Sequence, residues 1–353
     1  MCKKIFARQS PNIDLKDFKS AFRAIKSKEV VYGPLIEDFE RRFSEYTEIK
    51  YVGMLNMGRT AEWVALKAMD FSEGDEIIMP SYNFPIVPIL VKMSGLKPVF
   101  VDVEPDTFNI DPSLIEERVT SKTKAILITH MCGHPCEMDK IIDIKNKYGL
   151  RLIEDAVHSL GAEYKGKKVG TFGDVSYFSF YVGKTMTTFM GAAVGTNDGT
   201  IFNRIKDIVC DYKRLPLGEL FKAGGYGALT YFLTKPTIFS LTVYPVLILL
   251  NAYNSHLLDA RMEEPLLIPE RLHPSYLTRF SNLQAAVGLS QLERLQEFIY
   301  KRIRNSRLLS QNIEPSPLIS LPLKRAEVRH TFLYYFIREK IGAALEKAWS
   351  LKV

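Results

Sequence analysis

Cysteine is scarce in this chain of 353 residues, which has four cysteines, at positions 2, 132, 136 and 210. A set this small and scattered does not form the disulfide framework of a small secreted protein, and it suits a reducing compartment better. The first residues also lack the apolar core of a signal peptide before charged residues return, which argues against export. We therefore expect a cytoplasmic protein.

Charge of one sign is in only small excess, because 47 lysines and arginines stand against 40 acidic residues and leave a net charge of +7. A surplus of this size keeps a protein soluble, and it also suits an anionic substrate or a negatively charged membrane surface. The sequence lacks a recognition helix or aromatic platform for nucleic acid, so nucleic acid is not an expected partner. With 46% apolar and 25% charged residues, the composition is that of a globular protein with a sizeable core.

Short apolar runs alternate with stretches of helical spacing between residues 70 and 200. The runs lie at 76–80, 98–102, 124–130, 150–155, 175–180 and 192–196. Helices are predicted at 36–46 and at 112–119, the second with Asp111 as its N-cap. Strands that are apolar on both faces predict an α/β fold, in which a mostly parallel sheet is sandwiched by helices. Ligands of such sheets bind at the carboxyl ends of the strands.

Residues 215–258 differ from the rest of the chain, since no side chain from Pro236 to Leu258 carries a formal charge. Their length would allow a membrane span, but Pro245 and several polar residues interrupt it. A membrane-surface hairpin and a packed helical insertion are the other two interpretations. The sequence beyond this segment predicts one long amphipathic helix at 280–309, a strand-like apolar run at 331–337 and a short helical tail.

Lys184 follows a strand-like run, lies among aromatic, small and hydroxyl residues, and has no acid within ten positions on its C-terminal side. A desolvated lysine becomes a neutral amine and can form a Schiff base with a carbonyl, whereas a solvated loop lysine is the plain alternative. Two acids, Glu154 and Asp155, end the run at 150–155, and adjacent strand residues face opposite ways. An acid at this edge can keep a cofactor's ring nitrogen protonated, unless it serves a structural ion pair.

The segment 130–136 looks like a metal set because it contains two histidines and two cysteines. They are His130, Cys132, His134 and Cys136. These residues alternate along a strand end and a tight turn instead of forming a paired C-x-x-C knuckle, so we expect no metal site here.

Seven stretches of the sequence occur in an order found in one enzyme family. They lie at 32–52, 73–87, 95–117, 123–141, 150–186, 279–295 and 330–337. Together they resemble the DegT/StrS-type sugar aminotransferases, type I pyridoxal-phosphate enzymes that act on nucleotide-linked sugars. The resemblance implies a type I pyridoxal-phosphate-transferase fold, with a large cofactor-binding domain and N-terminal arm at 1–209. An apolar insertion atypical of the family follows at 210–272, and an incomplete smaller α+β domain occupies 273–353.

The resemblance also assigns site residues by position. It makes Lys184 the Schiff-base lysine that moves the proton between substrate and cofactor, and Asp155 the partner of the pyridine nitrogen. It places His158 near the phenolic oxygen of the cofactor, although a core histidine satisfied by backbone is the alternative. It places Phe84 where the family stacks an aromatic ring on the pyridine face.

The phosphate of the cofactor is held in the family by a glycine and hydroxyl turn at a helix N-terminus. This sequence keeps Gly58 but has Arg59 where the family usually has threonine or serine, followed by Thr60. Arginine can contact phosphate bidentately, so we expect a changed cradle, with the hydroxyl of Ser179 as a further contact. Leu277 replaces an asparagine that in the family reaches across to the partner subunit's phosphate, which bears on turnover.

The function implied by this resemblance is transamination of a nucleotide-linked keto sugar by a pyridoxal-phosphate enzyme, with an amino acid, above all glutamate, as donor. Such an enzyme makes amino sugars for a surface polysaccharide or a glycosylated metabolite. It is expected to be a homodimer with its active site at the interface. A family dehydratase would have histidine in place of Lys184. The other alternative is a catalytically impaired cofactor-binding relative that acts as a membrane-associated protein, through 215–258, or as a regulatory or interaction protein.

Overall fold

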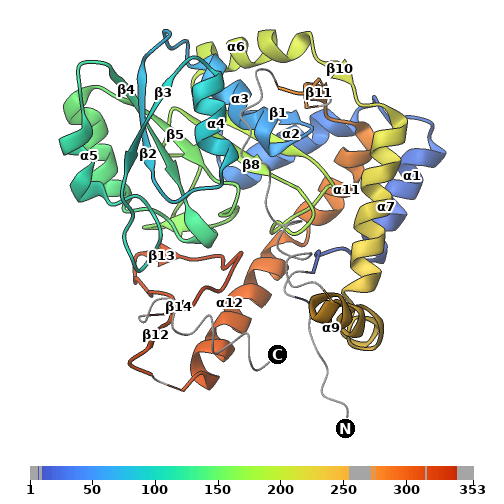
Figure 1. Cartoon of the computed structure of the whole chain (residues 1–353). Helices are drawn as coiled ribbons and strands as arrows, with labels where there is room; N and C mark the ends of the chain where they lie inside the picture. Colours follow the sequence, from blue (N-terminus) through green and yellow to red (C-terminus); the bar gives the residue numbers. More distant parts are fainter. Residues whose placement is uncertain (1–6, 8–9, 254–271, 275, 315, 340–353) are drawn as a thin grey trace.

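Residues 7, 10–253, 272–274, 276–314 and 316–339 are described by the computed structural model of this chain. Within them, the centre of the molecule is a nine-stranded sheet with the strand order β10-β11-β1-β9-β8-β5-β4-β2-β3 (Figure 1). Its strands are β1 (Tyr51–Leu55), β2 (Glu76–Pro80), β3 (Lys97–Val101), β4 (Thr123–Thr129), β5 (Arg151–Asp155), β8 (Val175–Ser179), β9 (Ala192–Thr196), β10 (Lys213–Arg214) and β11 (Thr278–Arg279).

Neighbouring strands β3, β2, β4, β5 and β8 run parallel, whereas β9 is antiparallel to both β8 and β1. The prediction of a mostly parallel sheet is thereby confirmed, and each of the six apolar runs forms a strand. Every residue of β2 and β9 is buried, as expected of strands covered on both faces. Because parallel strands end at the same edge, the loops after β2, β4, β5 and β8 meet there.

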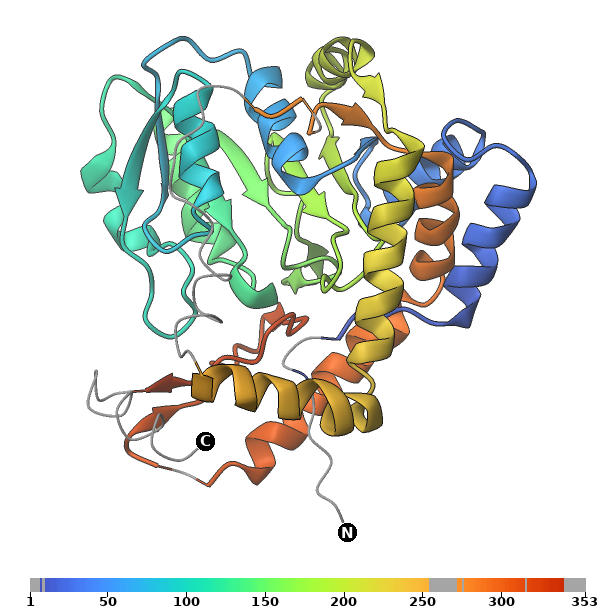
Figure 2. The same ribbon diagram turned by 45° about the vertical axis from the view of Figure 1, so that its right-hand side comes forward.

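Helices cover both faces of the sheet (Figures 1 and 2). One face, with Ile77 and Leu127, packs against α3, α4 and α6. The other face, with Phe178 and Ile126, packs against α2, α5 and α11. The helices are α1 (Leu15–Lys26), α2 (Leu35–Thr47), α3 (Gly58–Ala68), α4 (Ile86–Met93), α5 (Met138–Tyr148), α6 (Gly199–Cys210), α11 (Asn282–Leu292) and α12 (Leu295–Asn312). The helix predicted at 36–46 is confirmed as α2.

The prediction of a helix at 112–119 is wrong, because this stretch forms two 3₁₀ turns, η1 (Pro112–Leu114) and η2 (Glu116–Arg118). Asp111 does cap the first turn, accepting a hydrogen bond from the backbone N–H of Ser113. The two buried side chains of the stretch, Pro112 and Ile115, are three positions apart, which suits a three-residue turn better than the α-helical period.

The single long helix expected at 280–309 is also wrong, because the structure has α11 and α12 with a break at Glu293 and Arg294. Arg294 has non-helical backbone angles, φ −110° and ψ 2°. Its guanidinium pairs with Asp14 and with the fully buried Asp17, both from the N-terminal arm. This buried ion pair between distant parts of the chain overrides the local helical pattern.

The described part of the segment 215–258 is helical. It consists of α7 (Leu217–Leu233), α8 (Pro236–Ile238), a π-helical turn η4 (Phe239–Val243) and α9 (Tyr244–Tyr253). Helix α7 lies beside α11 and α1, and the later helices turn across its lower end (Figures 1 and 2). In the described residues, no single helix is long and apolar enough to cross a membrane. Helix α7 and the stretch Pro236–Leu250 meet that requirement only together, as a pair bent by 71°.

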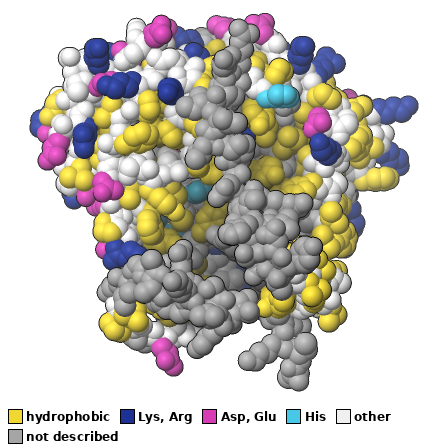
Figure 3. All heavy atoms as spheres, in the orientation of Figure 1, with side chains coloured by type: hydrophobic (Ala, Val, Ile, Leu, Met, Phe, Trp, Pro, Cys, Tyr) yellow, Lys and Arg dark blue, Asp and Glu magenta, His cyan; other side chains and the backbone are white. Residues whose placement is uncertain are grey.

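The outer side of these helices is apolar and exposed. On α7, Phe221, Leu229 and Phe232 are each more than half exposed. Further along, Leu241 and Leu249 are 68% and 69% exposed. Figure 3 shows hydrophobic side chains gathered along this side of the molecule. Helix α7 is therefore apolar on its packed face and on its free face.

The C-terminal part contributes short strands only. Strands β12 (Ile319–Ser320) and β14 (Arg338–Glu339) pair with each other, and β13 (Val328–Arg329) joins β6 (Glu163–Tyr164) and β7 (Lys167–Lys168). The apolar run at 331–337 forms no strand, against expectation. Its backbone bonds instead to the turn after β4, where Thr331 N–H donates to the carbonyl of Gly133 and Tyr334 N–H donates to the carbonyl of Cys132. The predicted helical tail lies outside the described residues.

Candidate active site

Polar residues of the predicted site gather at the carboxyl edge of the parallel strands and at the start of α3. Thr129 and Asp155 end the neighbouring strands β4 and β5 in direct register. His158 and Lys184 follow in the loops after β5 and β8, and the electric charge of Lys184 acts on both His158 and Asp155. The structure thus brings together the predicted lysine, acid and histidine.

Asp155 is buried at the end of β5, and its carboxylate accepts hydrogen bonds from the backbone N–H of Val157 (3.0 Å) and from the Thr129 hydroxyl (3.3 Å). Burial raises the pKa of this carboxyl, although both hydrogen bonds oppose the rise. The neighbouring Glu154 faces the other way and lies 3.1 Å from the ring nitrogen of buried His130. The strand geometry therefore separates the two acids, leaving Asp155 in the site and Glu154 in a structural pair.

Lys184 lies in the loop between β8 and β9. The atoms packed around its amine lower the pKa to about 8, although the negative charge of Asp155 opposes this shift. The amine is therefore partly neutral near physiological pH, which a nucleophile or a proton acceptor requires. Burial raises the pKa of nearby Cys132 to about 11, so this thiol stays neutral beside the lysine.

His158 is half-buried, and burial together with the charge of Lys184 lowers its pKa well below the usual value. Its Nδ1 atom is enclosed and has no hydrogen-bond partner among the described residues. The ring of Tyr334, from the C-terminal part, meets the imidazole edge-on at 5.7 Å between centroids. The site therefore holds a neutral histidine with one nitrogen left for a ligand, in contact with a residue of the C-terminal part of the chain.

The N-terminus of α3 lies against the end of β8. A Cβ atom added to Gly58 would lie 3.2 Å from both Cβ and Oγ of Ser179, so glycine allows the close approach of these segments. The hydroxyl of Thr60 donates to the backbone carbonyl of Tyr276 (2.6 Å), and the Arg59 guanidinium donates to the Tyr276 hydroxyl (3.1 Å). Gly58 and Ser179 thus lie side by side at the start of α3, while the Thr60 hydroxyl is bonded to Tyr276.

Phe84 lies on the loop after β2 and is 51% exposed. Its neighbour Asn83 donates a hydrogen bond to the Thr129 hydroxyl (2.8 Å), which in turn donates to Asp155. This chain of bonds ties the Phe84 loop to the predicted ring partner. Reasoning from sequence missed Asn83, Thr129 and Tyr334. The register of β4 beside β5 is the signal that could have found Thr129.

The histidines of the segment 130–136 hold structural hydrogen bonds. His130 Nδ1 accepts from the backbone N–H of Cys136 (3.0 Å), which leaves Nε2 to donate to Glu154. His134 Nδ1 donates to the carbonyl of Pro135 (2.8 Å). The described residues contain no group of three or more histidines, cysteines and acids arranged to hold a metal.

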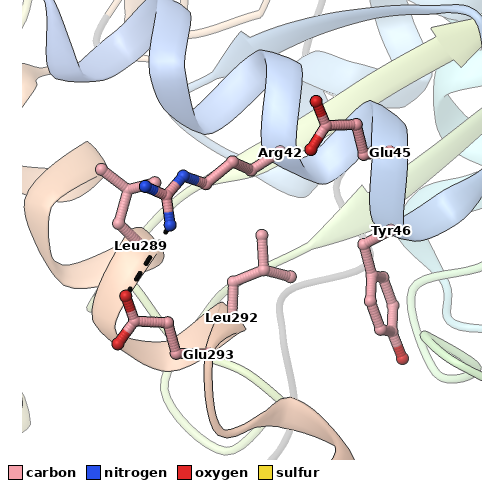
Figure 4. Close-up of a pocket in the computed structure, with 6 residues that line it drawn as sticks. All are labelled: Arg42, Glu45, Tyr46, Leu289, Leu292 and Glu293. Carbon is pink, nitrogen blue, oxygen red and sulfur yellow. Dashed lines mark ion pairs between the residues drawn. The ribbon is translucent and has the colours of Figure 1, made fainter.

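A hollow of about 350 Å³ lies on the surface between α2 and α11 (Figure 4). Arg42 and Glu293 face each other across it at 3.7 Å, with Leu289 and Leu292 at its base. None of its lining residues belongs to the predicted site, so this hollow is not the place where the predicted chemistry occurs.

Four features of the site fit pyridoxal phosphate. A cationic ring nitrogen would stabilise the carboxylate of Asp155, whose pKa is raised by burial. The unpartnered Nδ1 of His158 suits a phenolic oxygen, and the glycine-bordered start of α3 beside Ser179 suits a phosphate. The Lys184 amine, whose pKa is lowered to about 8, is the fourth such feature. Together these residues match the cofactor that the sequence predicts.

The sequence model of the DegT/DnrJ/EryC1/StrS aminotransferase family matches residues 11–214 and 258–349. A GDP-perosamine synthase of Escherichia coli O157:H7 is 32% identical over 300 residues, which cover 85% of this chain and 68% of that protein. A dTDP-3-amino-3,6-dideoxy-alpha-D-galactopyranose transaminase of Aneurinibacillus thermoaerophilus is 40% identical over 185 residues. That alignment covers 52% of this chain and 51% of the relative.

Solved structures of similar fold cover nearly the whole chain. An aminotransferase from Psychrobacter cryohalolentis superposes with a TM-score of 0.71 at 27% identity and covers 95% of this chain and 78% of that one. Helicobacter pylori PseC, an aminotransferase involved in the biosynthesis of pseudoaminic acid, has a TM-score of 0.75 at 23% identity. It covers 99% of this chain and 81% of that one. The expected fold is thereby confirmed.

Proposed function

This chain belongs to the DegT/DnrJ/EryC1/StrS aminotransferase family, and we propose that it transfers an amino group from an amino acid to a keto sugar linked to a nucleotide. The observation that carries the proposal is the Lys184 amine, with a pKa of about 8, in electrostatic contact with the buried Asp155. Named relatives act on GDP- and dTDP-linked sugars, which supports a nucleotide-linked acceptor.

Each residue of the site has a distinct task in this reaction. Bound pyridoxal phosphate supplies an electron-accepting ring that stabilises the charge left on carbon when a proton is removed. Asp155 would keep the ring nitrogen protonated through its carboxylate. Lys184 would hold the cofactor through its amine, which in its neutral form could also accept and return a proton. His158 offers Nδ1 to the ring hydroxyl, and the start of α3 with Gly58 and Ser179 receives the phosphate.

We also propose the remaining features of the enzyme on the strength of the family. Glutamate is the proposed donor, the proposed assembly is a homodimer with the site at its interface, and the proposed compartment is the cytoplasm. Phe84 is proposed to stack on the cofactor ring, and Arg59 to contact the phosphate. Leu277 is one of the features that favour the impaired, non-catalytic alternative, whereas the retained Lys184 and Asp155 favour a catalytic protein.

An absorbance titration tests the function directly. The purified chain with pyridoxal phosphate should show a visible band from its covalent lysine adduct, and glutamate should bleach that band as the amino group is transferred. Adding a keto sugar nucleotide should then restore it. A band that no amino donor bleaches would support the non-catalytic alternative.

A lysine substitution tests the residue assignment. Lys184→Ala should retain the fold and lose the covalent adduct, because it removes the amine that forms the adduct. The matched control is Lys97→Ala, whose lysine lies at the surface and pairs with Glu76. Survival of the adduct in Lys184→Ala would show that another lysine binds the cofactor.

The segment 215–258 is proposed to rest on the inner face of the membrane. It exposes several large apolar side chains, and the sequence from 213 to 253 contains four cations, Lys213, Arg214, Lys222 and Lys235, but one acid, Glu219. This balance complements an anionic lipid surface.

Vesicle co-sedimentation tests the membrane contact. Vesicles containing anionic phospholipid should sediment the protein, and neutral vesicles should not. Leu249→Ser should weaken the interaction, while Phe22→Ser, which changes an equally exposed residue on α1, should not. No sedimentation with anionic vesicles, or equal effects of the two substitutions, would contradict the proposal.

A further inference from the structure

The loop that carries Lys184 is held from several sides. The Asn12 side chain donates to the carbonyl of Thr185, directly after the lysine (3.0 Å). At the far end, Thr188 N–H donates to the carbonyl of Phe180 (3.0 Å), and the Gln284 side chain donates to the carbonyl of Met190. The backbone before and after the lysine therefore has fixed anchors.

Phe189 is the residue of this loop with the most constrained conformation. Its φ of +70° is in the left-handed region, which a bulky side chain rarely adopts. Its backbone N–H donates to the Thr187 hydroxyl (3.0 Å), and only 3% of its surface is exposed. Such a conformation persists only where the surroundings enforce it.

Helix α7 provides the surroundings that enforce it. The ring of Phe189 packs on a glycine face of α7, where a Cβ atom added to Gly227 would lie 2.5 Å from Cδ1 and 3.0 Å from Cε1 of that ring. A Cβ atom added to Gly224 would lie 4.0 Å from the same ring. Phe189 belongs to one apolar cluster with Leu220 of α7 and Leu283 of α11. The contact is tight enough that no side chain fits at position 227.

Helix α7 lies in the part of the chain, 215–257, that the family's sequence model leaves unmatched. Helix α7, which the family's sequence model does not match, therefore contacts the loop that carries Lys184. The contact is made on the packed face of α7, opposite the exposed apolar side chains of Phe221 and Leu229.

We propose that α7 is a positioning element for the catalytic lysine: the fit of the Phe189 ring on Gly227 sets the conformation of the loop that presents Lys184 to the cofactor. The proposal rests on the proposed function only for the role of Lys184. Reactive groups need placement within a fraction of an ångström, and a loop alone supplies this poorly. Phe189 and Gly227 act through the loop and touch neither cofactor nor substrate in this account.

Two valine substitutions on the same helix test the proposal. Gly227→Val places a side chain against Phe189, whereas Gly225→Val places the same side chain where nothing lies within 4 Å. Both changes alter helix propensity equally. Thermal unfolding of the cofactor-free chains measures any remaining difference in stability, so that it can be separated from the effect on cofactor binding. Two quantities are measured: the dissociation constant of pyridoxal phosphate, and the pH midpoint of the visible absorbance band of the adduct between the lysine and the cofactor.

Gly227→Val should weaken cofactor binding by roughly tenfold or more and shift the pH midpoint, because the lysine is displaced. Gly225→Val should leave both quantities unchanged. Phe189→Ala in the Gly227→Val background should restore much of the affinity by making room for the added methyl groups. Gly227→Leu with the wild-type Phe189 should behave like Gly227→Val if both chains fold.

Equal cofactor affinity and equal pH midpoints in Gly227→Val and Gly225→Val would overturn the proposal. So would a failure of Phe189→Ala to rescue the folded Gly227→Val chain. These outcomes are distinct from failure of the proposed function, which appears in the wild-type chain as an adduct that survives Lys184→Ala or as a band that no donor bleaches.

Discussion

The hydroxyl of Thr129 donates a hydrogen bond to the carboxylate of Asp155, with 3.3 Å between Oγ1 and Oδ2. Thr129 also accepts a hydrogen bond from Asn83, so the buried acid is connected to the loop that carries Phe84. This bond stabilises the ionised form of Asp155 against the effect of burial, which raises its pKa.

Replacing Thr129 by valine should raise the pKa of Asp155 further, because a donor to the ionised form is lost. Cofactor affinity should fall about tenfold near neutral pH, in line with a net hydrogen-bond contribution of about 1–1.5 kcal/mol. The loss should shrink at higher pH, where Asp155 is ionised in both proteins. Titrations of pyridoxal phosphate at several pH values measure this, with Thr129→Ser as the control. A loss that is independent of pH would contradict the explanation.

The reaction of Lys184 with the cofactor should depend on pH through the amine. Since its pKa is lowered to about 8, the rate of adduct formation should rise with pH up to about that value and then level off. Asp155→Asn removes the charge that raises this pKa, so the midpoint should move to lower pH. Stopped-flow absorbance across the pH range measures both curves. An unchanged midpoint in Asp155→Asn would show that the two side chains are not coupled.

Glu40 should make the folded chain less stable as pH rises from 4.5 to 7. Burial raises its pKa from 4.5 to about 7, so the unfolded chain loses the proton first and folding becomes less favourable over that range. The full shift corresponds to at most about 3 kcal/mol. Glu40→Gln keeps an acceptor for the backbone N–H of Met54 and should remove this part of the pH dependence. Denaturant unfolding at several pH values checks it, and identical profiles for both proteins would contradict the assignment.

The ion pair between Asp17 and Arg294 should stabilise the packing of the N-terminal arm against the break between α11 and α12. Asp17 is fully buried and also accepts hydrogen bonds from Ser290 and Gln291. Asp17→Ala leaves the guanidinium buried with one partner fewer, and should lower the free energy of unfolding by about 3 kcal/mol or more. Asp38→Ala removes an exposed pair with Arg41 and should change the free energy of unfolding far less, because water screens the pair. Similar losses in the two variants, measured by urea unfolding, would contradict this ranking.

Much of the fold was predictable because its signals are local. The buried runs that become β2 and β9 are apolar throughout, and they form strands with the predicted bounds. Predictions failed where a distant contact decided the outcome. Arg294 leaves the helical conformation to pair with the N-terminal arm, and the run at 331–337 bonds to the turn at Gly133 instead of joining a strand.

The sequence by itself determined the α/β pattern, the family motifs, and the choice of Lys184 and Asp155 as candidate site residues, because each strand, motif or candidate is marked by residues close together along the chain. Only the tertiary structure decided that Thr129 supports Asp155, that Tyr334 walls the site beside His158, and that α7 packs on the lysine loop. Those contacts join residues far apart in sequence. They form because the chain buries and closely packs these residues, and no local sequence pattern predicts such contacts.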